Sequence, residues 1–273
     1  MPQPRAFLFL LPLFLLVAVL EGGYIQFVQR RHYDWRAYLA STVDALVRIV
    51  INRVVGFGVA AALFAWVAEH RLGDIPMRNA WAWPVLIVAQ DFCFYWLHRA
   101  DHRVRWLWAT HAVHHSSNAY NFSAAYRLGW TSGLSGGALF FAPLVFVGFP
   151  LQAVLGAVAL NLLYQFWLHT ELVPRLGPLE WILNTPRHHR LHHASNPEYI
   201  DRNFGGVLIV FDRLFGTFAR DLAGVRCRFG LTRPLRAYNP LRIALHEWIG
   251  LGRDVRRSGS LRQAARELLG PPH

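Results

Sequence analysis

The sequence predicts an all-α integral membrane protein, a helical bundle of about four or five spans with a histidine-lined cap on its cytoplasmic side. Of its 273 residues, 54% are hydrophobic and only 16% are charged, whereas a soluble domain of this size carries about 25% charged residues. The mean hydropathy is +0.23. Apolar runs alternate with arginine-rich segments, as the positive-inside rule produces. The two cysteines exclude a disulfide scaffold and a thiolate-rich metal site.

The net charge of +12 raises the question of nucleic-acid binding, since all 28 basic residues are arginine. No zinc-finger, homeodomain or RNA-recognition pattern accompanies the charge. The arginines flank apolar runs instead, where anionic lipid headgroups favour them. We therefore expect a membrane and no nucleic acid as partner. The complete absence of lysine is typical of a GC-rich, bacterial genome, so we expect the inner (cell) membrane.

The first expected span begins in the unbroken apolar run 6–20 and continues less cleanly to Val28. A cleaved signal peptide is the alternative, because 15 apolar residues suit its hydrophobic region. No A-x-A cleavage site follows, which favours an uncleaved helix. A second span is expected at 44–68, with Arg48 and Arg53 reaching the membrane surface through their long side chains.

A third span is expected at 81–97, and Pro150 divides the runs 136–149 and 151–167 into a hairpin of two more. A crossing needs about 20 residues, so several of these are short, and re-entrant segments remain an alternative. The less apolar region after the last span is expected in the cytoplasm, ending in a charged helix at 253–267. Arginine clusters follow the first, third and last spans, and alternate threading places all three on one side, which should be the cytoplasm.

Nine of the fourteen histidines fall in two short windows, 98–115 and 188–193. Eight of them form one HxxxH box and two HxxHH boxes, at His98 and His102, at His111, His114 and His115, and at His189, His192 and His193. Residues three or four apart share one face of a helix, so each box points its imidazoles to one side. Three facing boxes offer eight imidazoles, more than one metal ion can bind. Imidazole suits Zn, Cu, Fe and Ni alike.

The boxes, in this order after an apolar run, resemble those of the fatty acid hydroxylase/sterol desaturase superfamily of membrane di-iron enzymes. The sequences around them, at 108–127, 184–206 and 211–218, are similar to the alkylglycerol monooxygenase branch. The likeness covers roughly residues 80–220. It implies N-terminal membrane spans at 1–79, a fatty acid hydroxylase-type di-iron catalytic domain at 80–220 and a cytoplasmic C-terminal tail at 221–273.

The resemblance also implies that the eight box histidines ligate two iron ions. His169 matches a further histidine of the family. Relatives often carry another histidine four residues later, where this chain has Val173, and His188 either fills that vacancy or extends its box. The implied ligands are thus His98, His102, His111, His114, His115, His169, His188, His189, His192 and His193. No catalytic side chain beyond the metal centre is expected.

Five polar residues near the boxes are candidates for a supporting role. Asp91 lies two helical turns before His98 on the same face, where it either orients an imidazole or forms a hydrogen bond between helices. Asp101 and Asp201 are further candidates for orienting imidazoles. Asn121 and Asn203 either orient a bound water or cap a helix.

The resemblance implies an oxidoreductase that uses O2 and an external reductant, a redox protein or a tetrahydropterin, to hydroxylate or desaturate a lipid such as a fatty acyl chain or a sterol. An alkylglycerol-type ether lipid monooxygenase is the alternative. Ether-cleaving relatives tend to have Glu where this chain has Arg103, and bacteria rarely hold much alkyl ether lipid. We therefore expect a stable hydroxylated or desaturated product.

Two other classes of protein use histidine clusters. A membrane zinc hydrolase would need a general base beside the metal, and the HExxH motif is absent from the sequence. A metal transporter would place its ligands near the middle of the bilayer, on broken helices. The histidine boxes instead follow the expected spans, in arginine-rich segments, which favours the oxygenase.

The arginine distribution predicts that the loop at 30–38 and the C-terminus both face the cytoplasm. Compartment-sensitive reporters placed at Arg36 and at His273 test this directly. A periplasmic C-terminus would contradict the topology and would separate the site from cytoplasmic reductants.

Overall fold

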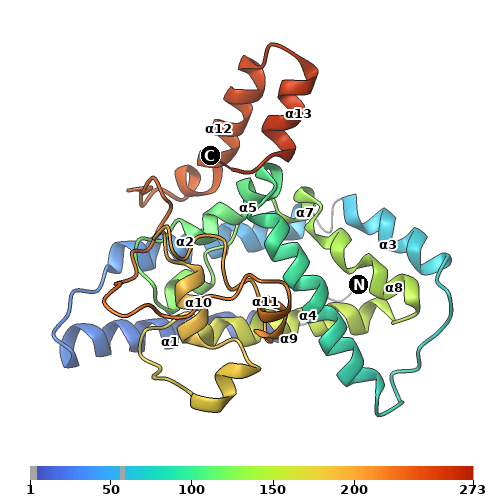
Figure 1. The fold of residues 1–273 in the computed structure, drawn as a ribbon, viewed down its shortest axis with the longest axis horizontal. Coiled ribbons are helices and arrows are strands. Elements are labelled where there is room, and N and C mark those ends of the chain that lie inside the picture. The colour runs from blue at the N-terminus through green and yellow to red at the C-terminus, as the bar shows by residue number, and fades with distance from the viewer. Residues whose placement is uncertain (1–4, 56–58, 273) are drawn as a thin grey trace.

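The computed structural model describes residues 5–55 and 59–272, and helices dominate this part of the chain (Figure 1). Its only strand-like pairings are two isolated bridges, Leu183 with Leu208 and Ala194 with Phe229. The helices are α1 (Arg5–Gly23), η1 (Tyr24–Val28), α2 (Trp35–Val55), α3 (Val59–Glu69), α4 (Ala82–Asp101), α5 (Arg105–His115), α6 (Phe122–Ala125), α7 (Ser132–Ser135), η2 (Gly137–Phe141), α8 (Ala142–Val147), α9 (Leu151–Leu168), η3 (Gly177–Trp181), α10 (Pro186–His192), α11 (Val210–Leu214), α12 (Pro240–Arg257) and α13 (Leu261–Leu269). The all-α prediction is confirmed.

Two described helices are long and apolar enough to cross a membrane, Leu10–Val28 and Leu151–Leu168. The first comprises α1 and the π-helical turn η1, and the second is α9. The buried side chain of Glu21 ties α1 to the domain, since it accepts hydrogen bonds from the Phe122 backbone N–H at 2.7 Å and the Thr170 hydroxyl at 2.5 Å. The helix is thus packed into the fold.

The other expected spans differ from the structure. The run 44–68 is divided between α2, which ends at Val55, and α3, which begins at Val59; residues 56–58 lie outside the described part. The run 136–149 forms only short helices and is too short to cross as Gly137–Val147. The run 81–97 is helical as α4, but buried polar residues on that helix lower its hydropathy. The predicted count of four or five spans therefore remains a prediction.

Apolar packing joins the N-terminal helices to the rest of the chain. Phe166 of α9 stacks on Phe14 of α1 and on Phe122 of α6, with ring centroids 4.2 and 5.0 Å apart. A larger cluster fills the space between α3, α4, α8 and α9, and includes Phe64 and Leu86. One face of α4 packs in this cluster. The packing fixes the position of α4, which carries the first histidine box.

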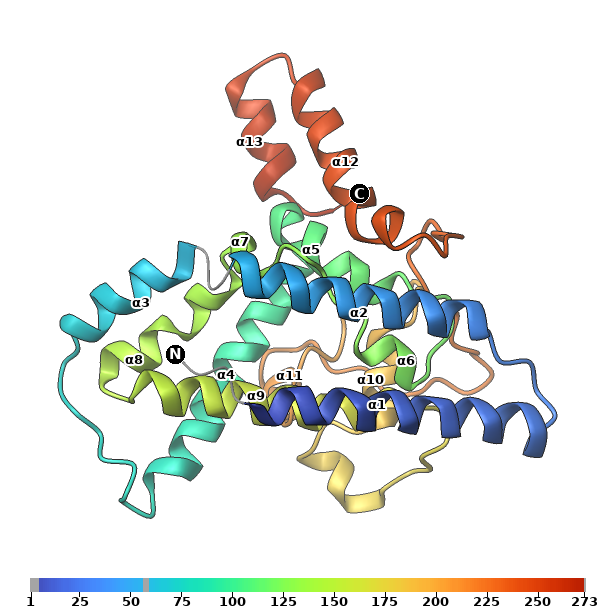
Figure 2. The same cartoon turned by 180° about the vertical axis from the view of Figure 1, so that it is seen from behind.

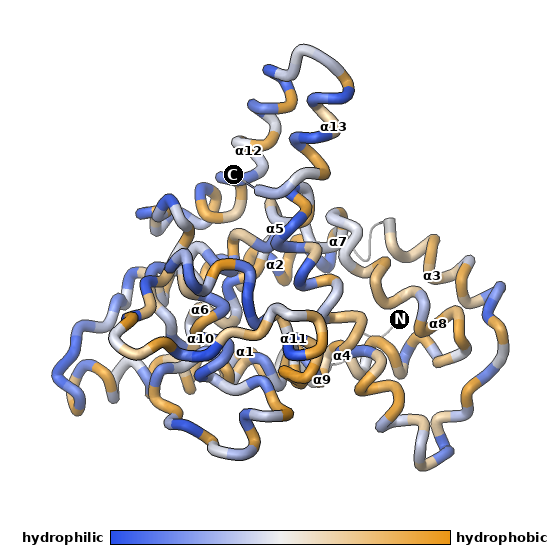
Figure 3. Tube along the Cα trace, viewed as in Figure 1, coloured by the Kyte–Doolittle hydropathy of each residue, from blue (hydrophilic) through white to orange (hydrophobic). Residues whose placement is uncertain are grey.

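Helices α1, α4 and α9 are rich in hydrophobic residues (Figure 3), and several of their large apolar side chains are exposed. They include Leu16 and Leu20 on α1, Val88 and Phe92 on α4, and Leu160 on α9. Contiguous exposed apolar patches mark sites that contact another protein or a membrane. Such faces are typical of helices that contact lipid, whose backbone groups are satisfied within the helix.

The C-terminus forms a helical hairpin, α12 and α13, that stands across the direction of α1 and α9 (Figure 2). The prediction of a single charged helix at 253–267 is therefore wrong, since α12 ends at Arg257 and α13 begins at Leu261. The hydroxyl of Ser260 accepts a hydrogen bond from the Gln263 N–H at 3.2 Å, and such an N-cap starts a new helix.

Candidate metal centre

Nine histidine side chains converge in two groups whose members come from four helices. Within each group the candidate ligand nitrogens all lie within 4.8 Å of one another. The first group is His98, His102, His111, His115 and His192, and the second is His114, His169, His189 and His193. All nine residues are buried except His111, which is half-buried.

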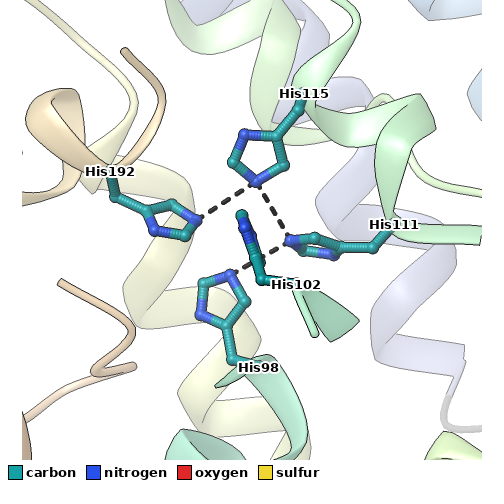
Figure 4. Close-up of side chains that lie close together, drawn as sticks. All are labelled: His98, His102, His111, His115 and His192. Carbon is teal, nitrogen blue, oxygen red and sulfur yellow. Dashed lines mark hydrogen bonds between the residues drawn. The ribbon is translucent and has the colours of Figure 1, made fainter. Parts of the chain in front are cut away.

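The first group lies where α4, α5 and α10 meet, and its five rings point toward a common centre (Figure 4). The Nε2 atom of His111 lies 3.1 Å from the Nε2 atoms of both His98 and His115. His192 Nε2 in turn lies 3.1 Å from His115 Nε2. The buried Nε2 of His102 has no hydrogen-bond partner among the described residues. The HxxxH spacing brings its histidines together because residues four apart share one face of a helix, and His102 directly follows the last residue of α4.

The second group draws on α5, α10 and the end of α9. His169, the residue that directly follows α9, places its Nε2 3.1 Å from those of His114 and His189. His193 Nε2 lies 3.2 Å from both His169 and His189. The first and second groups are neighbours, since the rings of His115 and His193 stack with centroids 4.4 Å apart. Each HxxHH box thus contributes to both groups.

Backbone carbonyls orient four of these imidazoles. The Nδ1 atoms of His98, His169 and His192 lie 2.8 Å from the carbonyl oxygens of Phe204, Gln165 and Arg202. The Nδ1 atom of His114 lies 3.1 Å from the Arg127 carbonyl. A carbonyl can only accept, so each Nδ1 carries the proton, and the Nε2 lone pair is left for a metal ion.

The donor set fits metal ions at both groups. Two lone-pair nitrogens about 3 Å apart repel each other, and a cation between them removes that repulsion. Metal–imidazole bonds of about 2.1 Å place two ligands at right angles about 3 Å apart, which matches the Nε2 separations of 3.1 to 3.2 Å. Neither group of nitrogens includes a carboxylate among the described residues.

Burial keeps the histidines neutral. It holds the pKa values of His111, His115, His192 and His193 well below their usual range, and nearby imidazoles lower them further. It lowers the pKa of His114 to about 4. Since only the neutral imidazole can bind a metal ion, the buried site favours the form that ligates.

Two of the expected carboxylates approach the first group from its outer side. The Asp201 Oδ1 lies 3.5 Å from His102 Nδ1, and the Asp101 Oδ2 lies 3.8 Å from His111 Nδ1. Arg103 contacts Asp201, with 3.2 Å between its Nε and the carboxylate. Arg103 is thus linked to His102 through Asp201.

Asp91 does not contact an imidazole. Its carboxylate accepts hydrogen bonds from the backbone N–H groups of Val207 and Leu208, both at 2.8 Å, and from the Asn161 amide at 2.7 Å. Asp91 thus joins α4 to α9 through Asn161 and holds the loop that contains Val207 and Leu208. Of the two readings from sequence, the hydrogen bond between helices is the one observed.

Asp212, which sequence reasoning missed, holds the same loop from its other end. Its carboxylate accepts hydrogen bonds from the N–H groups of Phe204 and Gly205, both at 2.8 Å, and from the Thr217 hydroxyl at 2.6 Å. The loop at 202–208 contains the carbonyls that orient His98 and His192. Asp91 and Asp212 therefore act on the first group through the backbone.

The two asparagines serve local structure. Asn121 caps α6, since its side chain accepts the Ser123 N–H. Asn203 adopts a φ of 57° and donates to the carbonyls of His188 and Ala219. His188 itself lies in neither group, and its ring packs against Phe218, with centroids 5.5 Å apart.

Comparisons with known proteins show which family the sequence is similar to. The model of the fatty acid hydroxylase family matches residues 83–217. Alkylglycerol monooxygenase of Danio rerio is 45% identical over 179 residues, which cover 66% of this chain and 39% of the relative. The human alkylglycerol monooxygenase is 41% identical over 189 residues, 67% of this chain and 40% of the relative.

A relative that is named for a different activity has a lower sequence identity. Ornithine lipid hydroxylase OlsE of Rhizobium tropici is 34% identical over 132 residues, which cover 48% of this chain and 40% of the relative. The chain spans about two-fifths of the length of these curated relatives. No solved structure matches the chain significantly.

The loop at 202–208 gives a test of how the site is held. A Cβ on Gly206 would lie 2.6 Å from Asn161 Oδ1 and from Asp91 Oδ1, so we expect Gly206→Ala to displace the loop, lower the melting temperature and reduce the bound metal. Gly156→Ala on α9 is the matched control, because nothing lies within 4 Å of a Cβ there. Equal metal content and melting temperature in the two purified variants would contradict this role of the loop.

Proposed function

The chain belongs to the fatty acid hydroxylase/sterol desaturase superfamily through residues 83–217, and from this premise we propose that it is a membrane-bound di-iron oxygenase that uses O2 to hydroxylate a lipid. Desaturation of the same kind of chain is included, because both reactions begin with removal of hydrogen from a C–H bond. The active site would face the cytoplasm of a bacterial inner membrane.

One observation carries this proposal. Two adjacent sets of neutral imidazoles, five in one and four in the other, leave their Nε2 atoms converging on two centres, and all of them except His111 are buried. Imidazole ligands suit several metals, so the donor atoms alone do not choose among them. Membership of a hydroxylase family favours iron, the redox-active choice, in both centres.

Two iron ions bound there would supply the activation of O2 and the oxidation of an unactivated C–H bond, chemistry that no side chain provides. The histidine residues would bind both ions, and the carbonyls of Phe204 and Arg202 keep His98 and His192 in the required tautomer. Burial of all but one of the nine side chains excludes water from the reacting groups. The electrons would come from an external redox protein or a tetrahydropterin.

The position of the two groups suits a substrate that arrives from the bilayer. His102 lies at the end of α4, and His169 directly follows α9, while the outer faces of both helices expose apolar side chains. A lipid chain alongside these helices would reach the site at their ends. A transporter would instead hold its ligands midway along its helices.

A zinc hydrolase would need a carboxylate beside the metal-bound water. Asp101 and Asp201 approach the histidines at Nδ1, the side away from the converging Nε2 atoms. Neither is placed to act as a general base at the proposed metal. The geometry therefore favours the oxygenase over the hydrolase.

An ether lipid is a second candidate substrate, favoured by the 45% and 41% identity to alkylglycerol monooxygenases. Oxygen inserted at the carbon beside an ether oxygen gives a hemiacetal, which collapses to a fatty aldehyde and a free glycerol lipid. The resemblance implies Glu in ether-cleaving relatives at the position of Arg103, which here contacts Asp201 beside His102. Hydroxylation or desaturation with a stable product remains the main proposal.

An assay separates the two substrates. Purified protein is supplied with an alkylglycerol, tetrahydrobiopterin and O2, and the aldehyde is measured, in parallel with lipid profiling of cells with and without the gene. We expect a stable hydroxylated or desaturated lipid that depends on the gene. Oxygen-dependent release of aldehyde would assign the ether lipid instead.

Substitution of one histidine from each group tests the proposed ligands. We expect His192→Ala and His114→Ala to abolish turnover and each to lower the metal content by up to half, because each removes a bond to a different ion. Elemental analysis of the purified variants measures the metal directly.

His246→Ala is the control, since His246 lies on α12 outside both groups and should leave metal content and turnover near wild type. Full turnover in His114→Ala would refute the assignment of the second group.

A further inference from the structure

The α12–α13 hairpin exposes apolar side chains in a regular pattern. On α13, Leu261, Ala265 and Leu269 follow one another at intervals of four residues, and all three are exposed. Leu261 is 91% exposed and Leu269 is 67% exposed. No residue of α13 is buried within the described structure. Residues four apart lie on one face of a helix, so these three form a continuous apolar stripe.

Arginines run beside this stripe. Arg262 and Arg266 follow Leu261 and Ala265 by one residue each and are exposed, so they lie along one border of the stripe. The whole hairpin, residues 240–269, carries six arginines and three carboxylates. An amphipathic helix with leucine on one face and arginine along its border is typical of the boundary between lipid headgroups and acyl chains.

The neighbouring helix repeats the pattern. Leu241, Leu245 and Ile249 of α12 are exposed at the same interval of four residues, while Ile243 and Leu251 pack inward. The buried side of α12 therefore faces α5 and α2, and the three exposed apolar residues lie on its other side. Both helices of the hairpin thus present apolar residues outward.

The hairpin is fixed to the domain rather than loosely attached. The buried guanidinium of Arg105 contacts Glu267 of α13 at 2.7 Å and Asp254 of α12 at 2.5 Å. The Arg105 N–H also donates to the Gly270 carbonyl at 2.9 Å. These contacts use two of the three carboxylates of the hairpin, and its outward charge is accordingly dominated by arginine.

The orientation of the hairpin suits a membrane surface. Its two helices stand across the direction of α1 and α9 (Figures 1 and 2), the two helices that are long and apolar enough to cross a bilayer. When α1 and α9 cross, α12 and α13 lie along the plane of the bilayer. A stripe of leucines bordered by arginines can then enter the surface of the bilayer while the guanidinium groups contact phosphates.

We propose that the α12–α13 hairpin is an interfacial membrane anchor, in which Leu261 and Leu269 enter the acyl-chain boundary of a bilayer and Arg262 and Arg266 bind anionic headgroups. The inference rests on membrane association of the chain and not on the reaction proposed for the histidine site. The anchor would hold the domain, through Arg105 and α5, at a fixed height beside the lipid from which a substrate arrives.

Fluorescent labelling of the full chain tests the proposal. Cys93 and Cys227 are replaced by alanine, and a single cysteine carrying an environment-sensitive dye is placed at Leu261 or Leu269, or at Gln263 as the matched control on the polar face. The three positions are exposed, so labelling does not disturb the core. The protein is reconstituted into phosphatidylcholine vesicles with and without phosphatidylglycerol, both containing brominated acyl chains.

We expect a blue shift and quenching by brominated lipid at positions 261 and 269, and neither at position 263. Both effects should be larger with phosphatidylglycerol, and Arg262→Gln with Arg266→Gln should abolish that difference. Equal exposure of all three positions to aqueous iodide in vesicles would overturn the proposal. A blue shift at 261 and 269 without quenching by brominated lipid would overturn it as well, because protein would then cover the stripe.

Discussion

The close approach of imidazole nitrogens is the constraint on which the rest of the structure depends. Nine histidines, all buried except His111, hold their Nε2 atoms within 4.8 Å of one another in each of two groups, an arrangement that repels unless cations lie between them. Four of them are fixed in the ligating tautomer by backbone carbonyls. Those carbonyls in turn belong to α9, to the segment after α6 and to the loop at 202–208, so backbone outside the histidine boxes sets the orientation of these rings.

The long apolar helices and the irregular segments position the histidines in different ways. Helices α4 and α9 present apolar faces outward and bring His98, His102 and His169 to their C-terminal ends. The region between α9 and α12 has little regular structure. Hydrogen bonds to buried carboxylates, rather than those of a helix or sheet, hold part of its backbone. Asp91 and Asp212 together accept four backbone N–H groups of residues 204–208. Buried N–H groups need such partners, and here the partners also position the ligands.

Much of the site could be predicted from sequence, because helical spacing alone gathers each box on one face. Asp101 and Asp201 could be predicted as well, being close to box residues or to the end of the loop. Asp212 could not, since it acts through backbone groups seven and eight residues earlier and its spacing to the histidines carries no pattern. The membrane spans were harder to predict from the sequence. Hydropathy does not distinguish a crossing helix from the short apolar helices at 137–147, which pack against α3 and α4. The division of the expected C-terminal helix into α12 and α13 was also missed, because it rests on the N-cap at Ser260.

The central claim is that the two groups of histidines bind a pair of iron ions. Elemental analysis of the purified full chain, combined with Mössbauer spectroscopy of protein produced with iron-57, tests it most directly. The account predicts about two iron ions per chain, with imidazole-ligated signals that are lost on chelation. Stoichiometric zinc, or a single metal ion per chain in fully folded protein, would contradict it.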